Sequence, residues 1–128
     1  MYVFTYGLLT NPDYMSGCTG EAAYVTNASF KFNYFANVTA GDSKVHGVLW
    51  NVPEEKIQDL DDIEGVPTFY KKIEVAAHTS NGMKEAVMYT MTENTIACSK
   101  NTTPSEFYLS QVLTGYKYFN LPISQLLI

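Results

Sequence analysis

The sequence predicts an α+β protein in which a small curled, mixed β-sheet or barrel carries short helices. Several β-prone apolar segments come first, a short amphipathic helix interrupts them, and a longer amphipathic helix follows the last strand. The 128-residue chain is long enough to bury a core, and 46% of its residues are hydrophobic. We therefore expect one domain that spans residues 1–128.

The first part of the chain contains four predicted strands. Gly7 ends the first of them, and Asn11-Pro12-Asp13 has the composition of a loop. The fourth is strongly apolar, and its Gly47 indicates either a bulge or the close approach of another backbone. The four strands are expected at residues 1–6, 21–26, 29–35 and 44–51.

A short helix follows these strands. Pro53 suits the first helical position, because the N–H group that proline lacks is not needed there. Gly65 suits the position just past the helix end, where a residue with positive φ is favoured. Ile57, Leu60 and Glu64 lie at i, i+3 and i+7, so they share one stripe that should face the core.

The second part of the chain reads as a β-hairpin and a C-terminal helix. Residues 70–78 and 84–91 are the two strands, and Ser80-Asn81-Gly82 between them is a turn sequence. Thr103-Pro104-Ser105-Glu106 matches a capping box with proline at the first helical position. The helix that follows should pack on the sheet through a stripe made of Leu109, Val112, Leu113 and Tyr116.

Glu64 places a carboxylate where the helix pattern calls for an apolar side chain. Burial, the negative end of the helix dipole and the neighbouring Asp61 should all disfavour its charged form, so they raise its pKa. A carboxyl group with a raised pKa can accept and release protons near neutral pH. The alternative interpretation is that Glu64 frays outward into solvent at the helix end.

Composition narrows the classes of partner. The net charge is −5 and all eight basic residues are Lys, which argues against a nucleic-acid partner. Because there is no Arg, an anionic ligand must be held by backbone N–H groups, by Lys or by hydroxyls. No apolar run approaches the roughly 20 residues of a membrane span, and no secretory signal is recognised. We expect a cytoplasmic protein without a membrane partner, in which Cys18 and Cys98 are reduced.

Other catalytic patterns are weak. His46 and His78 lie on different predicted strands, and no Cys or His cluster has the spacing of metal ligands, so we expect no metal. Nothing marks a nucleophile of the hydrolase type. The segment Tyr6-Gly7-Leu8-Leu9, in contrast, places a Gly at the mouth of a strand, where backbone N–H groups could point at a ligand carboxylate.

Taken together, these segments resemble the γ-glutamylcyclotransferase family, including its γ-glutamylamine cyclotransferase and AIG2-like branches. In that family a strand ends in Tyr-Gly-Ser/Thr-Leu. A Leu-Asp-x-x-Glu segment carries the acid/base Glu, and a Tyr follows six residues later. The matching segments are Tyr6-Gly7-Leu8-Leu9, Leu60-Asp61-Asp62-Ile63-Glu64 with Tyr70, the strand Val45-His46-Gly47-Val48-Leu49-Trp50 and the later Ala86-Val87-Met88-Tyr89.

The resemblance implies a reaction and a set of site residues. The reaction is cleavage of a γ-glutamyl amide to 5-oxoproline and a free amine or amino acid, with Glu64 as the single general acid/base. It implies no cofactor and no metal, a small-molecule γ-glutamyl substrate, and a monomer or homodimer. The implied substrate-binding residues are Tyr6, Gly7, Leu8, Leu9, Tyr70 and Tyr89.

Two positions depart from the family pattern. Leu8 stands where the family has Ser or Thr, so the binding loop loses a hydroxyl but keeps its backbone N–H groups. Lys72 stands where the family often has Arg. Three alternatives therefore stay open: an enzyme for an unusual γ-glutamyl conjugate or glutathione, a small-molecule-binding AIG2-like domain without turnover, and a protein-interaction domain.

Overall fold

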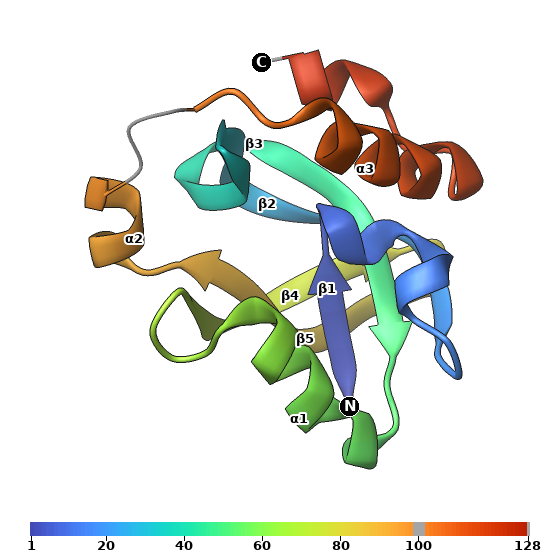
Figure 1. Ribbon diagram of the computed structural model, residues 1–128. Helices are drawn as coiled ribbons and strands as arrows, with labels where there is room; N and C mark the ends of the chain where they lie inside the picture. Colours follow the sequence, from blue (N-terminus) through green and yellow to red (C-terminus); the bar gives the residue numbers. More distant parts are fainter. Residues whose placement is uncertain (99–101, 128) are drawn as a thin grey trace.

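A closed five-stranded β-barrel forms the core of the computed structural model, which describes residues 1–98 and 102–127 (Figure 1). The order around the barrel is β1-β3-β2-β4-β5. Neighbouring strands are antiparallel except β1 and β5, which run parallel and close the barrel. The predicted α+β barrel with short helices is confirmed. The strands are β1 (Tyr2–Thr5), β2 (Thr19–Asn33), β3 (Phe35–Asn51), β4 (Tyr70–Thr79) and β5 (Gly82–Met91).

Short helices surround the barrel. In Figure 1, α3 lies above the barrel, α1 lies below it and α2 lies to the left. None of the helices in the described part of the chain is long and apolar enough to cross a membrane. The α-helices are α1 (Glu54–Glu64), α2 (Glu93–Cys98) and α3 (Glu106–Tyr118), and the 3-10 helices are η1 (Leu8–Thr10), η2 (Pro12–Tyr14) and η3 (Ile123–Leu127).

The hairpin of β2 and β3 is longer than the sequence pattern indicated. The two strands expected at residues 21–26 and 29–35 form one strand, which passes through a register irregularity near Asn27 (φ +53°). Tyr34, with φ +68°, makes the turn, so β3 begins at Phe35 and not near residue 44. Pairing with the partner strand keeps this polar segment extended, and local hydrophobic alternation could not reveal that.

The helix starts differ from the predicted ones by one or two residues. Pro53 is the N-cap of α1 and precedes the first helical residue, whereas Gly65 ends the helix with φ +66°, as predicted. Ser105 is the N-cap of α3, and its hydroxyl accepts a hydrogen bond from the Tyr108 N–H at 3.1 Å. Pro104 therefore lies before the helix, because Ser105 satisfies the free N–H group instead. The helix α2 was not predicted.

Gly47 marks a close approach of two strands and no bulge. A Cβ atom at this position would lie 2.1 Å from the carbonyl oxygen of Thr5 and 2.8 Å from the ring of Phe4. The register of β2 and β3 is regular there, with Ala23 opposite Gly47. Only Gly therefore lets β1 lie so close to β3 at the point where β1 ends.

The helix α3 packs directly on η1 and holds the segment that follows β1. The Asn11 side chain donates a hydrogen bond to the carbonyl oxygen of Gln111 at 3.1 Å. The Tyr116 hydroxyl donates to the carbonyl oxygen of Tyr6 at 2.7 Å. A Cβ atom on Gly115 would lie 2.5 Å from the carbonyl carbon of Thr10 and 2.6 Å from the Asn11 nitrogen, so α3 lies against the backbone of this segment. These contacts fix the Tyr6–Leu9 segment from outside the barrel.

Candidate functional site

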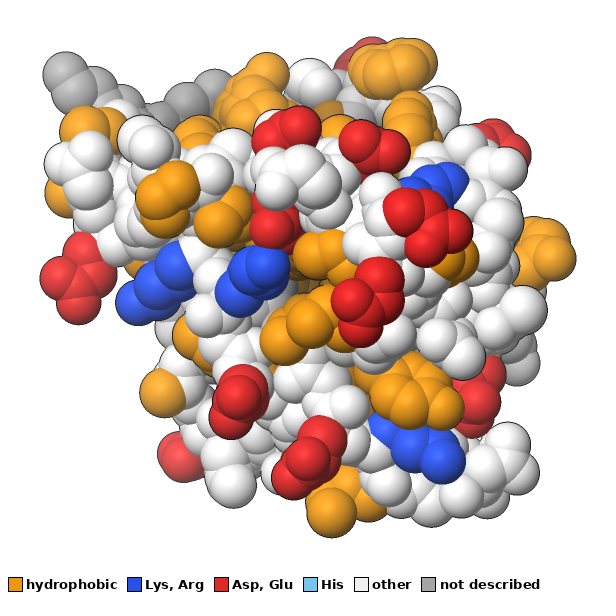
Figure 2. All heavy atoms as spheres, turned by 90° about the horizontal axis from the view of Figure 1, so that it is seen from below, with side chains coloured by type: hydrophobic (Ala, Val, Ile, Leu, Met, Phe, Trp, Pro, Cys, Tyr) orange, Lys and Arg blue, Asp and Glu red, His pale blue; other side chains and the backbone are white. Residues whose placement is uncertain are grey.

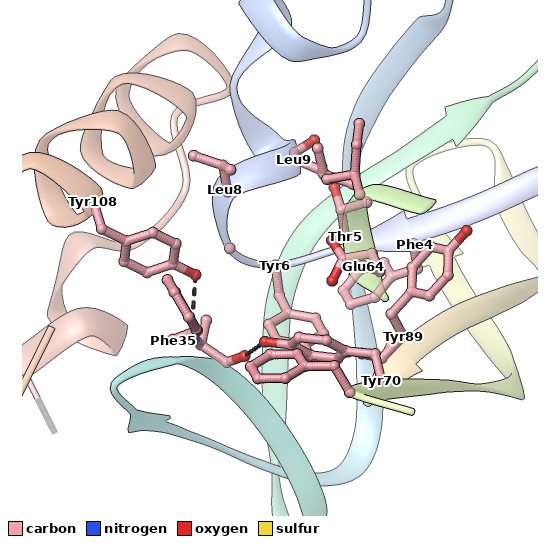
Figure 3. A pocket seen from close by; sticks show the side chains of 14 residues that line it. Phe4, Thr5, Tyr6, Leu8, Leu9, Phe35, Glu64, Tyr70, Tyr89 and Tyr108 are labelled. Carbon is pink, nitrogen blue, oxygen red and sulfur yellow. Dashed lines mark hydrogen bonds between the residues drawn. The ribbon is translucent and has the colours of Figure 1, made fainter. Parts of the chain in front are cut away.

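One cavity of about 160 Å³ lies between β1, the segment after β1, α1 and α3 (Figure 3). The structure brings every site residue expected from the sequence to this cavity. They come from four separate parts of the chain, so only the closed barrel and its helices place them together. These residues are Glu64, Tyr6, Gly7, Leu8, Leu9, Tyr70 and Tyr89.

Glu64 is the last residue of α1 and faces the cavity. It continues the buried side of the helix, where Leu60 is 1% exposed, so it does not fray into solvent. Burial raises the pKa of the Glu64 carboxyl to about 7. In the described residues the ion pair between Lys72 and Asp61 is the only one, so no cation offsets the charge of Glu64.

The predicted contribution of Asp61 to the pKa of Glu64 is not found, because burial alone accounts for the rise. Both oxygens of the Asp61 carboxylate accept a hydrogen bond. The carboxylate accepts one hydrogen bond from Lys72 Nζ at 2.8 Å and another from the Tyr89 hydroxyl at 2.7 Å. Partners of this kind balance its negative charge. They also tie the end of α1 to β4 and β5, which holds Glu64 in place.

Tyrosine hydroxyls fix the wall of the cavity. Tyr6 donates a hydrogen bond to the carbonyl oxygen of Tyr89, and Tyr70 donates to that of Ala36 at 2.8 Å. Burial raises the pKa of both hydroxyls well above the usual value, so both stay protonated. The Tyr108 hydroxyl accepts from the Ala36 N–H at 3.0 Å, and burial raises the pKa of Tyr108 to about 12.

The Tyr6–Leu9 segment follows the C-terminal end of β1 and lines the same cavity as Glu64, as the sequence indicated. Within η1 the Thr10 and Asn11 N–H groups make the helical hydrogen bonds, which do not use the Leu9 N–H group. The Leu8 N–H group faces the Tyr108 hydroxyl, and its hydrogen bond lowers the pKa of Tyr108 against the effect of burial. Figure 3 shows the Leu8 side chain on the Tyr108 side of the cavity, away from Glu64. The Leu8 side chain therefore does not cover the carboxyl group.

Seven further residues line the cavity and were not predicted. Phe4 and Thr5 come directly before the expected segment, and Ile63 comes directly before Glu64. Their proximity in sequence could therefore have indicated them. Tyr108 lies on the C-terminal helix, and its sequence carries no signal for the site. The full set is Phe4, Thr5, Phe35, Ala36, Ile63, Phe69 and Tyr108.

Neither histidine belongs to this cavity. His46 and His78 lie on β3 and β4 and both approach the ring of Tyr24, with centroid distances of 5.9 and 4.9 Å. Across residues 1–98 and 102–127, no group of three His, Cys, Asp or Glu side chains could hold a metal ion. Cys18 and Cys98 are free.

The raised pKa of Glu64 predicts a pH-dependent stability difference. Its pKa is about 7 in the folded state and lower in the unfolded state, so the stabilisation it contributes is complete below about pH 4.3 and lost as pH rises through about 7. We expect Glu64→Gln, neutral at every pH, to gain about 1–3 kcal/mol in unfolding free energy relative to the native protein above pH 7. Urea unfolding at acidic and alkaline pH measures this gain.

Glu55→Gln is the matched control for this measurement. Glu55 is exposed in the first turn of the same helix, so its replacement removes a charge without changing a buried group. The stability of Glu55→Gln should follow the pH dependence of the native protein. An equal pH dependence for Glu64→Gln would contradict the burial of an ionisable carboxyl.

Comparison with known proteins identifies the family of this chain. The sequence model of the AIG2-like family matches residues 44–125, which is more than half of the chain. No curated protein matches the sequence. Among solved structures, a gamma-glutamyl cyclotransferase superposes with a TM-score of 0.83 at 21% identity, over 97% of this chain and 82% of its own.

Two mammalian structures are similar as well. An uncharacterised human protein superposes with a TM-score of 0.83 at 22% identity, over 96% of this chain and 82% of its own. An AIG2-like mouse protein superposes with a TM-score of 0.56 at 19% identity, over 84% of this chain and 81% of its own. At these identities the structures show a shared fold. The family match and the shared fold agree, and the chain belongs to the AIG2-like family.

Proposed function

We propose that this protein is a γ-glutamyl cyclotransferase-type enzyme, which releases 5-oxoproline and an amine from a γ-glutamyl amide. The observation that supports this most is the Glu64 carboxyl, buried in the cavity with a pKa raised to about 7. A group with this pKa can act as base and as acid at neutral pH. The similarity to the fold of a gamma-glutamyl cyclotransferase supports the same reaction.

The reaction needs one proton carrier, because the substrate supplies its own nucleophile. The Glu64 carboxylate takes a proton from the α-ammonium group of the glutamyl unit. The free amine then attacks the γ-carbonyl carbon, and a five-membered ring closes with the C=O electrons moving onto oxygen. The C=O bond then re-forms as the C–N bond to the leaving amine breaks, and Glu64 returns its proton to that nitrogen. The ring nitrogen, which still carries one proton too many, loses it to the carboxylate, and this second proton passes to the departing amine, which leaves as an ammonium ion. Intramolecular attack has a high effective molarity, so no covalent enzyme intermediate is needed.

The backbone around η1 supplies the hydrogen-bond donors for this scheme. In our proposal the N–H groups from Gly7 to Leu9 bind the glutamyl α-carboxylate and stabilise the oxyanion that forms on the γ-carbonyl oxygen. Because the sequence has no Arg, the donors that line the cavity with Glu64 are backbone N–H groups and hydroxyls. A crystal soaked with 5-oxoproline should place its carboxylate about 2.7–3.2 Å from these nitrogens. Density at another site would contradict this assignment.

A panel of γ-glutamyl amides tests the proposed reaction. Incubation with the native protein should produce 5-oxoproline, detected by mass spectrometry, together with the free amine in equal amount. Glu55→Gln, which alters an exposed residue of the same helix, should produce as much. Binding of the amides without any 5-oxoproline would favour the alternative of a small-molecule-binding domain without turnover.

The pKa of Glu64 also predicts the pH profile of the reaction. The first step requires the carboxylate, so kcat/KM should fall about tenfold per pH unit below about 7 and level off above it. The profile is measured with one amide of the panel at constant ionic strength. If kcat/KM instead began to fall only near the ordinary glutamate pKa of about 4.3, the role assigned to a buried Glu64 would be contradicted.

A further inference from the structure

The mouth of the cavity is mainly apolar. The buried lining residues form the floor, whereas the lining residues other than Glu64 that remain partly or largely exposed form the rim. None of the rim residues carries a charge. A ligand that fills the floor must therefore cross an apolar rim to reach solvent. The rim residues are Leu8, Phe35, Ile63, Phe69 and Tyr108.

The rim holds no counter-charge for an anionic ligand group. Glu64 is the only lining residue with a charged side chain. Lys72, on the neighbouring strand β4, is bound to Asp61 at 2.8 Å and does not line the cavity. A carboxylate that entered the rim would lose water without gaining a cation and would be repelled by ionised Glu64.

Aromatic rings make up one side of the rim. The ring of Phe35 contacts the rings of Tyr108 and Phe69 edge to face, with centroid distances of 5.0 and 5.9 Å. Ile63, near the end of α1, also lines the cavity and is 57% exposed, which adds a large apolar surface to the rim. Rings fixed in this way offer a preformed surface to another aromatic group.

We infer that the part of the ligand that occupies the rim, the leaving amine, is apolar and preferably aromatic and carries no carboxylate. This inference rests on the proposed function, because it takes the floor of the cavity as the glutamyl site. It names the substrate class as γ-glutamyl amides of uncharged apolar amines. Conjugates whose amine is an amino acid or a peptide are then poor substrates, since each brings a carboxylate to the rim.

Three γ-glutamyl compounds separate the two parts of this inference. γ-Glutamyl-phenethylamide and γ-glutamyl-phenylalanine share a ring and differ by one carboxylate. γ-Glutamyl-ethylamide lacks both the ring and the carboxylate. We expect kcat/KM for the phenethylamide to exceed that for the phenylalanine conjugate by at least about 100-fold and that for the ethylamide by about tenfold.

A variant of the rim tests the structural origin of the preference. Phe35→Ala removes the ring that contacts Tyr108 and Phe69, so it should reduce the ratio of phenethylamide to ethylamide turnover to near one. Phe35→Leu, which keeps apolar volume, should retain part of that ratio. The control is Phe107→Ala, because Phe107 is 72% exposed on α3 and does not line the cavity.

The outcomes distinguish this inference from the proposed reaction. Release of 5-oxoproline from the phenylalanine conjugate as fast as from the phenethylamide would overturn the inference and keep the proposed reaction. If none of the three compounds releases 5-oxoproline, the proposed reaction fails, and calorimetric titration of the same compounds then measures the preference directly. Tightest binding of the phenethylamide would support the inference, whereas equal binding or no binding would overturn it.

Discussion

Glu64→Gln is expected to lower turnover of a γ-glutamyl amide by roughly 10²–10⁴-fold while the fold stays intact. Glutamine has nearly the same shape but cannot accept a proton from the α-ammonium group or return one to the leaving amine. The substitution also removes the cost of burying a charge, so we expect the loss of rate without a loss of stability. Initial rates of 5-oxoproline release measure the effect, and circular dichroism checks the fold.

The same rates measured for Glu55→Gln provide the control for charge alone. Glu55 and Glu64 share one helix, but only Glu64 lines the cavity. A near-native rate for Glu64→Gln on a confirmed substrate would move the acid/base role elsewhere. Asp61 would then be the first residue to replace, since it lies one turn away and contacts Tyr89.

Gly47→Ala is expected to destabilise the protein by about 3 kcal/mol or more, at the upper end of the cost of overpacking. The new methyl group would meet the carbonyl oxygen of Thr5 at 2.1 Å and the ring of Phe4 at 2.8 Å. Backbone oxygen cannot move aside as a flexible side chain can, so β1 and β3 must separate. Because β1 leads directly into the Tyr6–Leu9 segment, the surviving folded protein should also bind ligand more weakly.

Chemical denaturation measures the unfolding free energy of Gly47→Ala, and Ser43→Ala is the control. Ser43 is an exposed residue of the same strand, and its replacement should change the unfolding free energy by less than about 0.5 kcal/mol. Unchanged stability of Gly47→Ala would show that β1 and β3 can separate at little cost.

The sequence predicted the parts of the fold whose signals are local. The β4–β5 hairpin follows its turn sequence, with Thr79 paired to Gly82 across the turn. The end of α1 follows Gly65, whose φ of +66° is one that glycine adopts without strain. The first half of β3 and the helix α2 were missed, because pairing with β2 and packing after β5 determine them.

The parts of the candidate site that the sequence predicted are also those with a local signal. The segments around Gly7 and Glu64 carry recognisable motifs, and the structure brings both to one cavity. Phe35, Phe69 and Tyr108 carry no such motif. They reach the cavity because of the turn at Tyr34, the loop after α1 and the packing of α3 on η1, all of which are tertiary features.

The pairing of the first strand, β1, with the last strand, β5, affects the order in which the protein folds during synthesis on the ribosome. The strand β1 is synthesised first, but its parallel partner β5 pairs Val87 with Val3 and emerges much later. Tyr116, which holds the backbone of Tyr6, emerges later still. A nascent chain therefore carries an apolar strand with one open edge until β5 is made. The cavity is complete only when α3 adds Tyr108 after the barrel has closed, so we expect a chain shortened before α3 to form the barrel strands without a complete cavity.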